Sequence, residues 1–520
     1  MVRKWSGLGL LAVAGLLASC GGGSGSDGGG VAGGAAVCPA VNTTTARSAA
    51  VNLLSGTVAQ AESMQQTAGS TASPLQPRPA LRVLARAIAL GDVSQAKVAA
   101  VKPLVAQMGV PRQIGLPRDV AATSTLASTA ALLQWQATAA GGQVAAISIQ
   151  SGQAVGLRLG VLVKSLPASA TLRVYAQGAA TAYSIPAQDV LNTLARNRAA
   201  GDTSDAGRTY WAPVVDGTEA TLEIELPPQV STAGVEIAIP RVSHLFSSPL
   251  SVAKAGNTAK AGFSGASSCE VDVACSPSYA TESNAVARMG FVDGAAGSFL
   301  CTGTLVNDAT GSGTPYFLGA NHCINTQAEA STLQTWWFYR ASTCGASTQD
   351  AAATTRTGGA TLLYASQSTD TSFMRLADTP PTGAVFAGWS VAAPRLGDAA
   401  ATLHHPQGDW QAISTGVIQS YLSCTALTAA TLNFSCTPSN QANGNFVNAQ
   451  FSSGATEEGS SGSPLFETIG SGHYLVGQLY GGSSSCSPND RSGSNAYGRF
   501  DVAYNAALRQ WLAPGTAGCN

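Results

Sequence analysis

Three polar side chains, far apart in the chain, have the residue types needed for acyl transfer. The first is Ser461, which lies in a glycine- and serine-rich run from Gly459 to Pro464. Glycines on both sides of a serine permit a tight turn that presents its hydroxyl beside backbone N–H groups. We expect the N–H groups of Gly459 and Ser461 to form an oxyanion hole. A turn of this composition is also common in ordinary loops, so the motif alone leaves both readings open.

The second side chain is His322, which follows an apolar, strand-like run from Tyr316 to Ala320 and precedes Cys323. Histidine can act as a general base, and a base must be held rigidly. A disulfide between Cys301 and Cys323 would fix this segment and would stabilise the fold by roughly 3 kcal/mol. The alternative for any lone histidine is a structural role, which we assign to the two histidines His244 and His473.

The third side chain is Asp370, the first residue of the strand-like run 370–376. A carboxylate there can accept a hydrogen bond from the imidazole and fix its tautomer. An acidic residue at the start of a surface strand is common, so this residue alone is weak evidence for a catalytic acid. The support comes from the order His322, Asp370, Ser461 along the chain, which is the order found in chymotrypsin. This chemistry requires no metal and no organic cofactor.

Composition and cysteine content indicate an exported protein. The chain has 520 residues, 45% of them hydrophobic and 11% charged, and a formal net charge of -1. It lacks the clustered basic residues of a nucleic-acid-binding protein. The 11 cysteines have no metal-ligand spacing, so we expect disulfides formed in an oxidising compartment. No segment has the length and apolarity of a membrane span, and we expect a monomer.

The N-terminus has the pattern of a signal peptide over residues 1–19, with a basic start and an apolar run too short to span a membrane. The run ends in Leu17-Ala18-Ser19-Cys20, which resembles the lipobox of bacterial lipoproteins. This resemblance implies lipidation of Cys20 and a protein held on the cell envelope; ordinary secretion is the alternative. Residues 20–36 then form a flexible tether rich in glycine and serine.

The rest of the chain divides by its periodicity. We predict a helical region over 37–135, with an amphipathic helix at 81–90 and a second one at 93–108 that Pro103 would break. Short alternating runs at 143–149, 156–163, 170–176 and 220–226 predict a small β-sandwich-like domain over 136–250. A linker at 251–266 contains Lys254 and Lys260 as possible cleavage sites. Residues 267–520 are predicted to form an all-β domain.

Residues 267–512 resemble the trypsin-like serine proteases, and most closely their bacterial lysyl endopeptidase branch. The resemblance does not reach residues 40–260. It rests on motifs spread in the right order over the last domain, namely 299–303, 320–323, the run from Asp370, 403–406, 459–464, 476–482 and 497–499. It implies two antiparallel six-stranded β-barrels with the active site between them, and the triad His322, Asp370 and Ser461. The pair His404–His405 matches the family, and we interpret it as structural.

The resemblance also implies further site residues and disulfides. Substrate backbone would pair with Leu479, Tyr480 and Gly481, with Tyr480 beside the scissile residue. The implied bridges are Cys269–Cys486, Cys275–Cys344 and Cys301–Cys323. Cys424 and Cys436 are additional and could close a hairpin, and a pairing of Cys38 with Cys519 is a guess.

Two positions depart from the pattern. Many trypsin relatives have an acid just before the nucleophile, which pairs with a new N-terminus on activation; here that residue is Ser460. Lysyl endopeptidases have a pocket carboxylate two residues before the Tyr-Gly-Arg stretch; here that residue is Asn495. Because an amide gives no counter-charge to a buried ammonium, the residue preferred at P1 stays open. Asp490 is near in sequence and could compensate.

The function expected from these features is a serine endopeptidase acting on protein and peptide substrates. Two alternatives remain, an esterase or other acyl hydrolase with the same triad, and a non-catalytic surface lipoprotein on a protease fold. Residues 37–250 are interpreted as a pro-region that assists folding or blocks the cleft until cut, which would make the chain a zymogen. The alternative is a permanent module that positions the protease.

Overall fold

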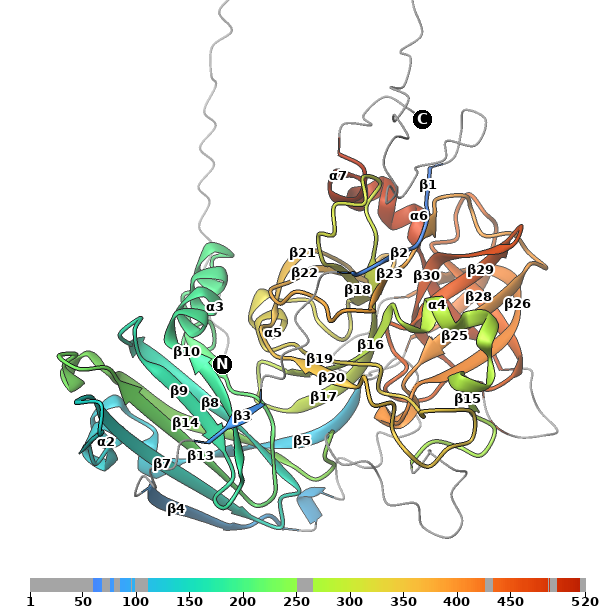
Figure 1. Ribbon diagram of the computed structural model, residues 1–520. Helices are drawn as coiled ribbons and strands as arrows, with labels where there is room; N and C mark the ends of the chain where they lie inside the picture. The colour runs from blue at the N-terminus through green and yellow to red at the C-terminus, as the bar shows by residue number, and fades with distance from the viewer. Residues whose placement is uncertain are drawn as a thin grey trace, which may run out of the picture. The chain divides into compact units, whose positions relative to one another are not determined.

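The computed structural model describes residues 59–67, 75–78, 85–94, 96–98, 111–249, 265–425, 434–484, 486 and 493–514. Within these ranges the fold is dominated by β-strands (Figure 1). No helix in the described ranges has the length and apolarity needed to cross a membrane. The lipobox at Cys20 and the tether 20–36 lie outside the described residues, as do Lys254, Lys260 and Asp490.

The N-terminal part folds as two β-sheets that share one hydrophobic core, with helix α3 (Ala187–Ala199) beside them (Figure 1). The core is filled by inward-facing residues such as Ile147, Leu159 and Ile224, all fully buried. Three of the four strands predicted in this domain lie within observed ones, and the run 170–176 extends one residue beyond β9 at each end. The first sheet contains β3 (Leu75–Pro77), β10 (Thr181–Pro186), β9 (Thr171–Tyr175), β13 (Glu219–Leu226), β7 (Gln143–Gly152) and β4 (Ala85–Asp92), and the second contains β11 (Thr209–Trp211), β8 (Gly156–Ser165), β14 (Glu236–Leu245) and β5 (Arg112–Asp119).

The helical region predicted over residues 37–135 is largely wrong where the structure describes it. Within the expected helix 81–90, the described residues from Ala85 onward form β4, which pairs in parallel with the edge of β7. Ile88 and Leu90 pack on the core with a spacing of two, so strand pairing overrides the helical periodicity. The described helical pieces are a turn at 96–98, a short 3₁₀ turn, and α2 (Leu126–Leu132).

The C-terminal half of the catalytic region is a closed six-stranded antiparallel barrel. Strand pairing runs β25-β26-β28-β31-β30-β29 and returns to β25, so no edge is left open. Side chains such as Ile418, Leu465 and Val476 fill its interior. The strands are β25 (Ala399–His404), β26 (Ala412–Cys424), β28 (Phe446–Ser453), β29 (Pro464–Ile469), β30 (Gly472–Gly482) and β31 (Asn495–Arg499).

The preceding half of the catalytic region does not close in the same way. Its described pairings form an open path, β20-β19-β16-β17-β18-β22-β21, around a second core that includes Phe317, Trp337 and Met374. Of the two closed barrels expected, therefore, one is observed among the described residues. The strands are β16 (Val286–Val292), β17 (Ser298–Val306), β18 (Tyr316–Ala320), β19 (Gln334–Trp337), β20 (Thr354–Arg356), β21 (Ala360–Ser366) and β22 (Thr371–Leu376).

Strand β5 joins the N-terminal sheets to the catalytic region. It pairs with β14 along one edge and with the first residues of β17 along the other, matching Gln113 to Phe299 and Arg112 to Leu300. Gly115 has no room for a side chain here, because a Cβ would lie 2.5 Å from Leu245 and 3.1 Å from Ser298. One continuous sheet thus runs from the N-terminal domain into the catalytic domain.

A neutral polar network lies beneath the turn that precedes β29. His404 is fully buried; its Nδ1 is 2.7 Å from Ser460 Oγ and its Nε2 is 3.1 Å from Ser414 Oγ. Ser460 Oγ accepts the N–H of Glu457, and Ser414 Oγ donates to the carbonyl of Ala455. Burial lowers the pKa of His404 to about 3, so the imidazole stays neutral, and its Nε2 also lies 3.6 Å from the buried carboxylate of Glu270.

We predict that unfolding takes up protons between about pH 6.5 and pH 3. Burial also lowers the pKa of His405 to about 3, whereas both histidines titrate near 6.5 in the unfolded chain. The unfolded state therefore binds more protons in this window. The free energy of unfolding falls as the pH is lowered, by about 1.4 kcal/mol per pH unit for each histidine. Denaturant titrations at several pH values measure this slope; His404→Gln should reduce it by about one proton, and an unchanged slope contradicts the prediction.

Candidate active site

His322 and Asp370 form a buried hydrogen-bonded pair. The register of β18 and β22 aligns Ala320 with Thr371, so the residues just beyond these two strand ends meet. His322 Nδ1 lies 2.7 Å from Asp370 Oδ2, and the N–H of His322 donates to Oδ1 at 2.9 Å. The two side chains are 6% and 3% exposed. This geometry fixes the imidazole with Nδ1–H toward the acid and Nε2 away from it.

Asp370 is held in an unusual backbone conformation, with a φ of 51°. Aspartate tolerates this left-handed region better than most residues do. Its carbonyl accepts the N–H of Asn321 at 2.9 Å, which ties its loop to the segment that carries His322. Burial raises the pKa of Asp370, and the charge and hydrogen bonds of His322 oppose that rise. The pair therefore depends on His322 to keep the acid ionised.

The turn that carries Ser461 requires glycine on both sides, as its composition predicted. Gly459 and Gly462 have φ values of 86° and 81°. A Cβ on Gly462 would lie 2.5 Å from the carbonyl oxygen of Thr302 and 2.9 Å from the nitrogen of Ala320. The turn can therefore reach β17 and β18 only because these positions have no side chain.

The same contacts bring Ser461 to the histidine-bearing segment. Its carbonyl accepts the N–H of Thr302 at 2.8 Å and lies 4.0 Å from Sγ of Cys323, the residue after His322. His322 Nε2 is buried and has no hydrogen-bond partner in the described part of the chain. In this conformation the histidine is bonded to the acid and not to the Ser461 hydroxyl. Catalytic hydrogen bonds are often long until substrate binds.

Two backbone donors flank the nucleophile position. Among the described residues, the N–H groups of Gly459 and Ser461 donate no hydrogen bond, whereas Ser460, Gly462 and Ser463 all use theirs. The carbonyl of Gly459 is held by Thr302 Oγ1 at 2.8 Å, which orients this peptide. Sequence reasoning assigned no role to Thr302, although its place after the bridged Cys301 was a signal.

Strand β30 passes beside all three parts of the site. The Tyr480 ring lies 5.8 Å from the His322 ring, and Gln478 Nε2 donates to the carbonyl of Thr369 at 2.7 Å. Leu479 is locked to the Ser461 turn, because its N–H donates to Ser463 and its carbonyl accepts from Gly462, both at 2.8 Å. Gly481 follows, paired with Ala496 of β31. The three residues proposed to bind substrate backbone thus lie next to the catalytic residues.

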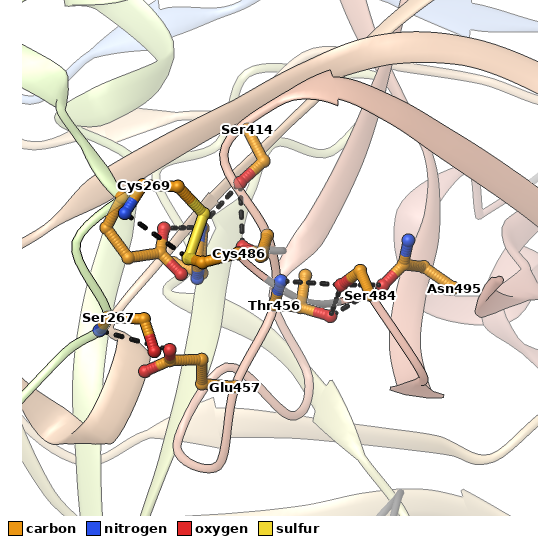
Figure 2. The surroundings of a disulfide bond; sticks show 11 residues. Ser267, Cys269, Ser414, Thr456, Glu457, Ser484, Cys486 and Asn495 are labelled. Carbon is orange, nitrogen blue, oxygen red and sulfur yellow. Dashed lines mark hydrogen bonds and ion pairs between the residues drawn. A yellow bond between two sulfur atoms is a disulfide. The ribbon is translucent and has the colours of Figure 1, made fainter. Parts of the chain in front are cut away.

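Asn495 is fully buried at the start of β31, and both polar atoms of its side chain are hydrogen-bonded. Its Oδ1 accepts hydrogen bonds from Thr456 Oγ1 and Ser484 Oγ, both at 2.7 Å, and its Nδ2 donates to the carbonyl of Ala449 at 3.0 Å. Figure 2 shows Thr456, Ser484 and Asn495 converging near the Cys269–Cys486 disulfide. Among the described residues, which do not include Asp490, the groups bonded to the Asn495 side chain are hydroxyls and a backbone carbonyl, with no carboxylate.

The described residues contain four disulfides, and all four are pairings that the sequence suggested. They are Cys269–Cys486, Cys275–Cys344, Cys301–Cys323 and Cys424–Cys436. Cys38 and Cys519 lie outside the described residues. His473 stacks on Tyr279 at 4.1 Å, and His244 Nδ1 lies 2.7 Å from Ser151 Oγ, away from the catalytic residues. Within the described ranges, no group of three or more potential ligands could hold a metal ion.

Sequence reasoning missed one contact at this site. Arg112 of β5 lies 3.7 Å from the carboxylate of Glu458, which directly precedes Gly459, and it also donates to the side chain of Gln407. Burial lowers the pKa of Arg112, and the charge of Glu458 opposes that effect. No local sequence motif predicts this ion pair, because Arg112 and Glu458 come from different domains.

Solved structures similar to this chain are bacterial proteases with low sequence identity. The MamO protease domain from Magnetospirillum magneticum is 14% identical and covers 44% of this chain and 98% of its own, with a TM-score of 0.29. The Rv3671c protease from M. tuberculosis, in its active form, is 12% identical and covers 51% and 95%, with a TM-score of 0.31. A serine endoprotease from Yersinia pestis is 16% identical and covers 46% and 66%, with a TM-score of 0.30.

Sequence comparisons identify both domains. The family model of the lysyl endopeptidase C-terminal domain matches residues 263–498, and that of the lysyl endopeptidase N-terminal domain matches residues 88–246. A lysyl endopeptidase of Pseudomonas aeruginosa is 35% identical over 329 residues, which are 61% of this chain and 66% of that protein. The resemblance therefore extends into the region where sequence motifs had given none. The chain belongs to the lysyl endopeptidase family of serine proteases.

Proposed function

We propose that this chain is a serine endopeptidase that hydrolyses peptide bonds through Ser461, His322 and Asp370. The observation that carries the proposal is the buried hydrogen bond between His322 and Asp370. The Nε2 atom of His322 has no partner among the described residues, and the next residue, Cys323, lies 4.0 Å from the carbonyl of Ser461. Membership of a protease family supports the same reading. The activity is proposed for the whole chain, since the P. aeruginosa relative is matched over 66% of its length.

The proposed reaction has two acyl-transfer steps. Ser461 Oγ attacks the substrate carbonyl while His322 Nε2 takes its proton, and Asp370 stabilises the imidazolium that forms. The N–H groups of Gly459 and Ser461 would bind the tetrahedral oxyanion. His322 then gives the proton to the leaving amine, and water repeats the sequence on the acyl-enzyme.

Substrate would bind as a strand beside Leu479, Tyr480 and Gly481. At Leu479 only the second lone pair of the carbonyl remains for this pairing, because the N–H and the first lone pair already hold the Ser461 turn. The Tyr480 ring, near His322, would wall the pocket beside the scissile bond.

For the residue at P1, we propose a neutral side chain in place of lysine. The described polar groups around Asn495 are neutral and bond to one another, so an ammonium placed there would lose its hydration without gaining a counter-charge from them.

The export and anchoring of the chain remain proposals. A lipid on Cys20 would hold the protein on the bacterial cell envelope, and the four disulfides suit an oxidising compartment.

We further propose that the uncut chain is a zymogen in which β5 restricts access to the site. β5 covers the edge of β17 next to Cys301 and Thr302, and its Arg112 pairs with Glu458 in the turn that carries Ser461. An extended substrate approaching from this side would have to displace that strand. A cut in the linker 251–266 would free the N-terminal domain to move β5 away from the edge of β17.

Replacement of the triad residues tests the activity. We expect Ser461→Ala to abolish both peptide hydrolysis and labelling by a fluorophosphonate probe, and Asp370→Asn to lower kcat by about 10⁴-fold through loss of the correct imidazole tautomer. Ser471→Ala, in an exposed turn, is the matched control. Persistent labelling of the Ser461→Ala chain would contradict the assignment, and hydrolysis of esters without peptides would indicate an acyl hydrolase.

Asn495→Asp tests the P1 proposal. The new carboxylate keeps the hydroxyl donors Thr456 and Ser484 but faces the Ala449 carbonyl, so the free enzyme is less stable and a cationic side chain is favoured. Cleavage after lysine should rise on the order of tenfold relative to other residues, about 1.4 kcal/mol. Mass spectrometry of a digested proteome measures the change, with exposed Asn443→Asp as control. Strong lysine preference in the unaltered enzyme would overturn the proposal.

Charge reversal at Arg112 tests the zymogen proposal. Arg112→Glu places two acids together, so we expect the uncut chain to hydrolyse a peptide substrate on the order of tenfold faster, about 1.4 kcal/mol. Arg241→Glu, which breaks an exposed pair with Asp119 in the same domain, should change nothing. Equal rates for uncut and linker-cut protein would show that β5 does not restrict the site.

A further inference from the structure

A short segment from the N-terminal region is built into the catalytic domain. Residues 59–66, which we call the strap, contain β1 (Gln60–Ala61) and β2 (Met64–Gln65). β1 pairs antiparallel with β24 (Trp389–Ser390), which itself lies beside β30, and β2 pairs with β23 (Val385–Phe386). In Figure 1 these blue strands lie among the yellow to red strands of the catalytic domain. The strap thus adds strands to a domain that begins about 200 residues later in the chain.

Close packing shows that the catalytic domain is shaped for this segment. Ala61 is fully buried and belongs to the core cluster that contains Trp389, Leu475 and Phe500. A Cβ on Gly388 would lie 2.6 Å from the carbonyl oxygen of Ala61. The side chain of any residue other than glycine at position 388 would therefore clash with the backbone of the strap.

Polar contacts fix the register of the strap. Asn307 Nδ2 donates to the carbonyl of Glu62 at 2.9 Å, and the hydroxyl of Tyr474 donates to the Glu62 carboxylate at 2.8 Å. The N–H of Gly388 donates to Ser63 Oγ at 2.9 Å. Backbone hydrogen bonds extend this pairing at both ends, from Val391 to Ala59 and from Gln66 to Ala384. An extended peptide with a small residue at position 61 and an acid at position 62 is the ligand that this groove fits.

We propose that the strap is a noncovalent attachment that holds the catalytic domain to the N-terminal leader after the linker is cut. The linker 251–266 connects the N-terminal part of the chain covalently to the catalytic domain. The contacts of the strap with the catalytic domain do not involve the linker, so a cut there leaves them in place. The cut belongs to the proposed function, but the attachment does not depend on catalysis. Linker cleavage alone would therefore leave the protease bound to whatever holds the leader, including a lipid on Cys20.

A chain cut at two engineered sites tests the attachment. One site for a sequence-specific protease is placed in the linker and another in residues 68–74, between the strap and β3, so that the N-terminal domain is detached from both. An affinity tag lies in residues 21–36. Ser461→Ala prevents self-cleavage, and Cys20→Ser and Cys38→Ser remove any lipid or disulfide attachment. After both cuts, we expect the catalytic fragment to stay on the affinity resin with the leader.

Single substitutions in the strap supply the controls. Ala61→Arg places a charge in the buried position and should release at least nine-tenths of the catalytic fragment, whereas Gln65→Arg, at an exposed position of the same strap, should retain it. An excess of a peptide spanning residues 57–67 should also release it, which needs no altered chain. Elution of the folded catalytic fragment from the unaltered strap after both cuts overturns the proposal, as does retention despite Ala61→Arg.

Because the test uses an inactive chain, its failure and the failure of the proposed peptidase activity are distinguishable. Loss of the strap contact would leave the triad assignment untouched. Conversely, an active protease whose catalytic fragment elutes freely would overturn the strap proposal and leave the proposed peptidase activity intact.

Discussion

Contact between the Ser461 turn and the ends of β17 and β18 is the constraint on which the site depends. The two halves of the catalytic domain have separate cores, and Ser461 comes from one half while His322 and Asp370 come from the other. Their approach is limited by backbone atoms, since Gly462 leaves no space for a Cβ between Thr302 and Ala320. Thr302 then holds the turn with its N–H and its hydroxyl. This contact sets the position of Ser461 relative to His322 and Asp370. That position matters because small misplacements of reacting groups lower the rate of catalysis.

The position before Ser461 shows how neutral groups help to hold this turn, in addition to the Arg112–Glu458 ion pair. Ser460 bonds to the neutral imidazole of His404 and to the N–H of Glu457, so the turn is ordered by hydroxyl groups and an imidazole. These bonds are already complete in the uncut chain. An activation step is therefore not needed to form these bonds, which agrees with the proposal that β5 restricts access to the site.

The sequence predicted those features that are written into local patterns. Ser461, His322 and Asp370 each lie next to the end of a strand or in a glycine-rich turn, and these local patterns, together with their order in the chain, made them candidates. The strands of residues 143–226 were visible from their alternation. The segment from Ala85 was misjudged because alanine, leucine and isoleucine fit a helix and an edge strand equally well. Local patterns did not predict the pairing of β5, the strap contacts or the Arg112–Glu458 ion pair. Each of these joins segments that are far apart in the sequence, and a local pattern carries no information about such contacts.

The bridge between Cys269 and Cys486 connects the start of the catalytic domain to the wall of the Asn495 pocket. Ser484, two residues before Cys486, donates to Asn495, while the backbone near Cys269 is anchored to Asp409 and Glu457 through Gly265 and Ser267. The first residues after the linker are therefore mechanically linked to the pocket (Figure 2). A change in the position of Cys269 would therefore be passed through the disulfide to the segment that carries Ser484 and its hydrogen bond to Asn495.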